Sequence, residues 1–82
     1  MFKVELTNNA GDNETSLGVS LNQVLKSVLG KFLDKDAYGK TRCTIYKDDE
    51  ELSWSWGSSA KEAVTMAQRK MKKFEDFRKD IL

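Results

Sequence analysis

The first residues of the chain alternate between hydrophobic and polar side chains, and this pattern predicts a β-strand. In FKVELT, residues 2–7, the apolar side chains occupy the even positions and the polar ones the odd positions. A period of two is typical of a strand that is covered on one face only. The polar stretch that follows, residues 8–18, is rich in turn-forming residues and predicts a loop.

The hydrophobic pattern then changes to the spacing of an amphipathic helix. Ser20 can cap this helix, because Gln23 stands where a capping box needs it. Val19 can pack on Val24 as a hydrophobic staple, and the helix is expected to end near residues 34–39. The predicted buried stripe consists of Leu21, Val24, Leu25, Val28, Leu29, Phe32 and Leu33.

Two strands at residues 41–47 and 51–56 are predicted to form a hairpin with its tip at residues 48–50. In the second strand, apolar residues alternate with glutamate and serine, and Trp54 and Trp56 share the apolar face. One apolar face per strand predicts that both tryptophans point into the core. The opposite face would be open to solvent or to a partner. It would carry Lys3, Glu5, Thr7, Arg42, Thr44, Tyr46, Ser53 and Ser55.

A second helix is predicted after the hairpin. Ser58 or Ser59 can cap it, and Glu62 is placed to complete a capping box from Ser59. Small side chains at its beginning would allow the helix to approach the sheet closely. The predicted buried stripe consists of Ala60, Ala63, Val64, Ala67, Met71, Phe74 and Ile81.

The order strand, helix, strand, strand, helix predicts an α+β fold. Residues 1–82 are expected to form one small domain, a two-layer sandwich with a three-stranded sheet and both helices on one face. If the first two predicted strands are neighbours, they are expected to be parallel, because a helix connects them.

Charge is segregated along the chain, although 14 basic and 13 acidic residues give a net charge of only +1. The hairpin tip is acidic, with Asp48, Asp49, Glu50 and Glu51 in succession, and we expect it to contact a protein partner. The last helix has a basic flank that offers the alternative, a nucleic-acid contact. This flank consists of Lys61, Arg69, Lys72, Lys73 and Lys79.

The residues that most catalytic and metal sites require are missing. The chain has no histidine, which excludes Ser–His and Cys–His pairs, and no glycine-rich phosphate loop. The single cysteine, Cys43, is expected to be a buried, inert thiol. The segment from Asp34 begins like a calcium loop, with Asp36 and Gly39 in place, but Ile45 stands where the essential glutamate belongs. We expect no enzymatic activity, no cofactor and no metal.

Residues 57–71, GSSAKEAVTMAQRKM, are similar to the end of a double-stranded-RNA-binding domain. Ser59, Lys61, Ala63 and Ala67 fall in comparable places, where that family opens a helix after a strand. Val64 stands where the family has a second lysine, and a strand rather than a helix opens the chain. We therefore interpret the resemblance as a shared way of starting a helix.

Together these patterns predict a small, non-catalytic protein-binding module. A phage-type inhibitor or modulator of a host defence or regulatory complex is one form it could take, because such proteins act by occupying a partner. The alternative is an RNA- or DNA-binding protein that uses the basic flank. We expect a cytoplasmic location and no membrane contact, since no apolar run approaches the length of a membrane span.

Overall fold

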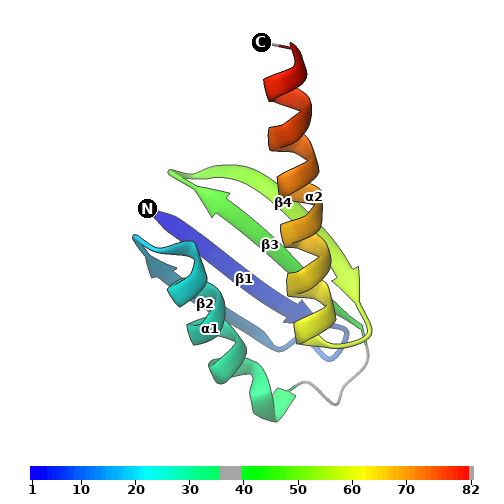
Figure 1. The fold of residues 1–82 in the computed structure, drawn as a ribbon. Coiled ribbons are helices and arrows are strands. Elements are labelled where there is room, and N and C mark those ends of the chain that lie inside the picture. Colours follow the sequence, from blue (N-terminus) through cyan, green and yellow to red (C-terminus); the bar gives the residue numbers. More distant parts are fainter. Residues whose placement is uncertain (36–39, 82) are drawn as a thin grey trace.

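The computed structural model shows a four-stranded antiparallel sheet with two helices packed on one face (Figure 1). It describes residues 1–35 and 40–81, with the side chains of residues 1–34 and 40–72. The strand order is β2-β1-β3-β4. The elements are β1 (Phe2–Asn8), β2 (Asn13–Gly18), α1 (Leu21–Phe32), a short 3-10 turn (Leu33–Lys35), β3 (Thr41–Lys47), β4 (Glu50–Gly57) and α2 (Ala60–Ile81).

Strand β2 corrects the sequence prediction, which placed a loop there and counted three strands. A compact turn joins it to β1, in which the Asn8 side-chain oxygen accepts hydrogen bonds from the backbone N–H groups of Ala10 and Asp12, each at 3.0 Å. On the helix side, Ser16 of β2 is buried and its hydroxyl lies 3.0 Å from that of Ser27 on α1. Because β2 contacts the core through the hydroxyl group of Ser16, its sequence lacks the alternation of apolar and polar residues that predicts a strand.

The same strand explains why β1 and β3 are antiparallel neighbours rather than parallel ones. Because β2 returns the chain to its starting end before α1 begins, the crossover delivers β3 in the opposite direction to β1. Val4 therefore lies opposite Ile45, and Leu6 lies opposite Cys43.

A bulge in β4 reverses the predicted orientation of both tryptophans. Ser53 pairs with Ile45 but Glu51 pairs with Tyr46, so Leu52 is an extra residue in the ladder. Leu52 packs against the core, and the alternation beyond it is shifted by one residue. Ser53 and Ser55 are consequently buried, whereas Trp54 and Trp56 are 40% and 46% exposed.

The close approach of α2 to β4 gives the physical reason for this orientation. The Ser53 hydroxyl donates a hydrogen bond to the Ala67 carbonyl at 2.7 Å. A Cβ on Gly57 would lie only 2.4 Å from the backbone nitrogen of Ala63. Serine, glycine and alanine fit between this helix and strand, and an inward tryptophan would force them apart.

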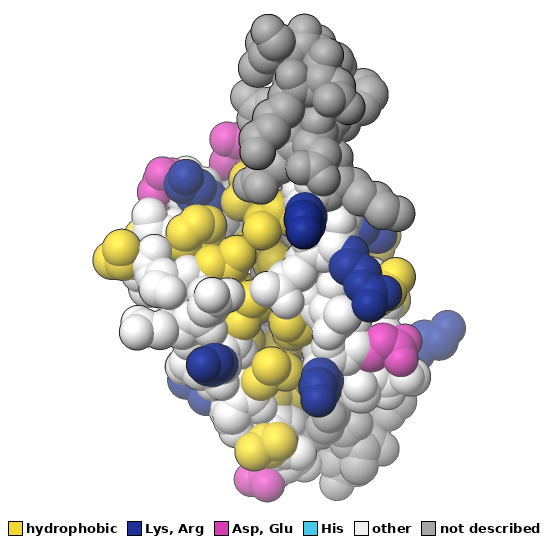
Figure 2. All heavy atoms as spheres, in the orientation of Figure 1, with side chains coloured by type: hydrophobic (Ala, Val, Ile, Leu, Met, Phe, Trp, Pro, Cys, Tyr) yellow, Lys and Arg dark blue, Asp and Glu magenta, His cyan; other side chains and the backbone are white. Residues whose placement is uncertain are grey.

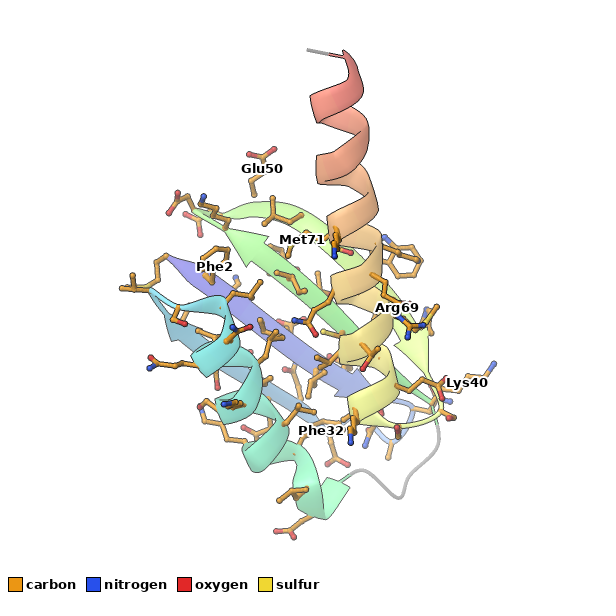
Figure 3. All side chains as sticks on the ribbon, viewed as in Figure 1. Phe2, Phe32, Lys40, Glu50, Arg69 and Met71 are labelled. Atoms are coloured by element: carbon orange, nitrogen blue, oxygen red, sulfur yellow. The ribbon has the colours of Figure 1, made fainter. Side chains whose placement is uncertain are left out.

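The hydrophobic core lies between the sheet and the helices, with Phe2 and Phe32 at opposite ends of this layer (Figure 3). It contains most of the predicted stripe residues, but Leu33 is exposed and falls outside it. Phe74 and Ile81 lie outside the described side chains. The buried apolar set is Val4, Leu6, Val24, Leu25, Val28, Phe32, Cys43, Ile45, Ala60, Ala63, Val64 and Ala67.

The two helix starts differ from each other. Helix α2 begins as predicted, because Ser59 Oγ accepts a hydrogen bond from the Glu62 N–H at 3.2 Å. The Glu62 carboxylate reaches back to Ser58 rather than to Ser59. At α1, Ser20 is the N-cap but makes no side-chain capping bond, and Val19 is exposed, so the predicted box and staple are wrong.

Neither helix, within the described residues, has the length and apolar character needed to cross a bilayer.

Candidate functional site

The face of the sheet opposite the helices carries the candidate site, which we call the open sheet face. Lys3, Arg42 and Tyr46 lie on it, as predicted. Ser53 and Ser55, predicted for this face, are instead buried under α2. The outward positions of the four strands are Asn13, Thr15 and Leu17 on β2; Lys3, Glu5 and Thr7 on β1; Arg42, Thr44 and Tyr46 on β3; and Glu51, Trp54 and Trp56 on β4.

Cationic side chains lie over two of the three aromatic rings on this face, those of Trp54 and Tyr46. The Arg42 guanidinium lies 4.6 Å from the centroid of the Trp54 ring, and Lys70 Nζ lies 4.8 Å from it. Lys3 Nζ lies 4.4 Å from the centroid of the Tyr46 ring. Such cation–π contacts orient both partners. Trp56 has no cation over its ring among the described residues and presents the most available aromatic surface.

A shallow depression is lined by the half-buried ring of Tyr46 and the exposed ring of Trp56. Its volume is about 250 Å³, and Thr44, itself almost fully buried, belongs to its lining. This volume is smaller than that of most small-molecule pockets, which begin near ~300 Å³ and enclose their ligand. A protruding side chain of a larger partner suits it better. The lining residues are Glu5, Thr7, Arg42, Thr44, Tyr46 and Trp56.

A lysine from each helix donates a hydrogen bond to a backbone carbonyl group of an edge strand. Lys31 Nζ on α1 donates to the Thr15 carbonyl of β2 at 2.9 Å. Lys70 Nζ on α2 donates to the Trp54 carbonyl of β4 at 3.1 Å. Charged lysines at an edge oppose the addition of another strand. A partner therefore has better access to the open sheet face than to the edges.

The predicted acidic tip is a tight two-residue turn beside this face. Asp48 and Asp49 have φ angles of +50° and +68°, as the favoured hairpin turn requires. The Met1 ammonium donates to the Asp48 carboxylate at 2.7 Å, which lowers the pKa of Asp48. Glu50 is exposed and extends from the tip (Figure 3), while Glu51 lies 4.0 Å from Arg42 Nη2. The tip thus adjoins the open sheet face through Glu51.

The predicted basic flank lies in the helical layer. Lys61, Arg69 and Lys72 are exposed on α2, and Arg69 points away from α1 (Figure 3). The side chains of Lys73 and Lys79 lie outside the described residues. Because the sheet separates this flank from the open sheet face, the two do not form one surface. Lys70, which the sequence analysis did not select, is the basic residue of α2 that reaches Trp54.

A second hollow, of about 290 Å³, separates the two helices on the other side of the molecule. Figure 2 shows hydrophobic atoms along this channel, with Lys and Arg side chains on both sides of it. Nothing in the structure shows what would cover it. Its lining consists of Asn22, Leu25, Lys26, Leu29, Lys61, Val64, Thr65 and Gln68.

The thiol of Cys43 is not suited to act as a nucleophile. It is fully buried, as predicted, and burial raises the pKa of its thiol to about 12, which leaves almost no thiolate near neutral pH. Within the described ranges, no three acidic or cysteine side chains come together as a metal site would need. Asp36 and Gly39 of the calcium-like segment lie outside the described residues.

Comparison with protein-family models, curated proteins and solved structures found no significant match. The resemblance of residues 57–71 to a double-stranded-RNA-binding domain is confined to the β4–α2 junction. In this protein the chain opens with two strands, β1 and β2, whereas a double-stranded-RNA-binding domain opens with a helix.

Proposed function

We propose that this protein is a small, non-catalytic binding module that docks its open sheet face onto a protein partner. The observation that carries the proposal is the exposure of Trp54 and Trp56 beside Arg42 and Tyr46. Tryptophan, tyrosine and arginine are the residue types that dominate the binding energy of protein interfaces. Docking of this kind would block or redirect the partner, which is how a phage-type inhibitor would act.

The composition of the face also suits a protein partner. Two aromatic rings, those of Tyr46 and Trp56, line the depression together with Glu5 and Arg42, and charges of both signs continue around it at Lys3 and Glu51. Enrichment in aromatic residues and arginine is typical of protein interfaces. Four strands of this length cover roughly 20 by 20 Å, which falls short of the ~800 Å² that each partner usually buries. The adjoining acidic tip would extend the contact, and its role stays a prediction.

Single-stranded nucleic acid is the second candidate ligand. Trp56 and Tyr46 could stack on bases, and Arg42 and Lys3 could contact phosphates. Two observations place this candidate second. Glu5 and Glu51 share the face with these residues and would repel the successive phosphates of a strand, and the basic flank of α2 belongs to the opposite layer.

Affinity capture from a lysate of the source organism separates the two candidates. The bait is the whole chain, compared with a Trp54→Ser/Trp56→Ser variant and a Lys61→Gln/Arg69→Gln/Lys72→Gln variant, with and without nuclease. We expect one protein to be captured by the wild type and by the basic-flank variant, to resist nuclease, and to be lost with the tryptophan variant. Capture that nuclease abolishes, or that survives loss of both tryptophans, would refute the proposal.

A further inference from the structure

Arg42 occupies a central and pre-organised position on the open sheet face. It lies on β3, a central strand, opposite Thr7 on one side and Trp56 on the other. Its guanidinium stacks on the Trp54 ring, 4.6 Å from the centroid. A stacked guanidinium has already lost much of its rotamer freedom, so binding through it costs less entropy than binding through a free side chain.

The side-chain hydrogen-bond donors of Arg42 have no acceptor within the described part of the chain. The nearest carboxylate oxygen, Glu51 Oε1, is 4.0 Å from Nη2, too far for a hydrogen bond. Its Nε is buried and has no acceptor. The side chain as a whole is 41% exposed, so an acceptor from a partner can reach the donors of its Nη groups.

The surroundings of Arg42 favour an anionic acceptor. Lys3 and Lys70 both lie over rings of the same face, and Arg42 itself lines the depression. The carboxylates on this face are Glu51, whose Oε1 lies 4.0 Å from Arg42 Nη2, and Glu5, which makes no ion pair with Arg42. A planar carboxylate matches the guanidinium fork and can accept two parallel hydrogen bonds from it.

We infer that Arg42 is the anchor of the open sheet face for an acidic side chain, aspartate or glutamate, of the protein partner. The carboxylate enters the depression beside Trp56 and accepts hydrogen bonds from the guanidinium, which Trp54 holds in place. This inference rests on the proposed function, because it names the chemistry of the partner at the same site.

The test uses three probes on the folded, isotope-labelled protein: a blocked tetraglutamate peptide, a blocked tetralysine peptide and a short oligouridylate. The readout is the NMR signal of the Arg42 Nε–Hε group at constant ionic strength. We expect tetraglutamate alone to shift this signal saturably. Arg42→Lys, which keeps the charge but loses the fork, should weaken that binding about tenfold, with the backbone amide spectrum showing that the fold is retained.

Glu51→Gln provides a matched variant that leaves Arg42 in place. Because it removes the carboxylate 4.0 Å from the guanidinium, it should tighten tetraglutamate binding, so that the Arg42 signal shifts at lower peptide concentration. No shift of the Arg42 signal with tetraglutamate, equal binding by Arg42→Lys, or a larger response to tetralysine would overturn the inference. Tighter binding of oligouridylate would overturn it in favour of nucleic acid. If Trp54→Ser/Trp56→Ser loses the captured protein while Arg42→Lys keeps it, the proposed function stands and only the inference fails.

Discussion

Replacing Gly57 by alanine is expected to lower the free energy of unfolding by about 2 to 3 kcal/mol. The added Cβ would lie 2.4 Å from the backbone nitrogen of Ala63 and 2.9 Å from its Cα. Backbone atoms in the first turn of a helix cannot rotate away as the end of a side chain can, so α2 would have to lift from β4. Urea denaturation of the two proteins measures the difference.

Gly30→Ala is the matched control for this experiment. Gly30 lies within α1, and a Cβ added there would meet no atom within 4 Å. Alanine at an unhindered helical position should raise stability by about 0.5 to 1 kcal/mol. If Gly57→Ala were as stable as the wild type, α2 would not sit closely on β4, and the reason given for the outward tryptophans would be lost.

Replacing Trp56 by serine is expected to weaken the partner complex by about 30-fold or more, because hot-spot residues contribute ~2 kcal/mol or more each. The free energy of unfolding should change by less than about 1 kcal/mol, because the ring is nearly half exposed and lies outside the core. Calorimetric titration with the captured partner gives the first value, and urea denaturation gives the second.

Leu33→Ser is the control for the loss of an exposed apolar side chain. Leu33 is 73% exposed at the end of α1, away from the open sheet face. Its replacement should leave the affinity for the partner unchanged. An equal loss with Leu33→Ser, or no loss with Trp56→Ser, would show that the partner binds elsewhere.

Much of the fold follows from local sequence patterns. Both helices and the β3–β4 hairpin were predicted, because each has a clear apolar period. The cap at Ser59 was predicted for the same kind of reason, since its partner Glu62 is only three residues away. Strand β2 was missed because its core contact is the hydroxyl of Ser16 against Ser27, which leaves no hydrophobic alternation to detect.

The candidate site was predicted only in part. Lys3, Arg42 and Tyr46 were placed correctly, because β1 and most of β3 alternate without interruption. The tryptophans were misplaced, because a one-residue bulge inverts every later side chain and leaves no mark in the hydrophobic pattern. The sequence of α2 could have indicated the outward orientation of the tryptophans. Its buried residues include several alanines, which bring the helix close to β4, so that only small residues of β4, namely the serines and Gly57, fit beneath it.

Acrylamide quenching of tryptophan fluorescence, with and without the captured partner, tests the central claim most directly. In the free protein, Trp54 and Trp56 should show red-shifted emission and be readily quenched, because both rings are on the solvent side of the sheet. Saturation with a partner that has no tryptophan of its own, or whose tryptophans have been replaced, should shift the emission to the blue and reduce quenching. Blue-shifted, protected emission in the free protein would contradict the outward orientation. Quenching that the partner leaves unchanged would contradict the assignment of the open sheet face as the binding surface.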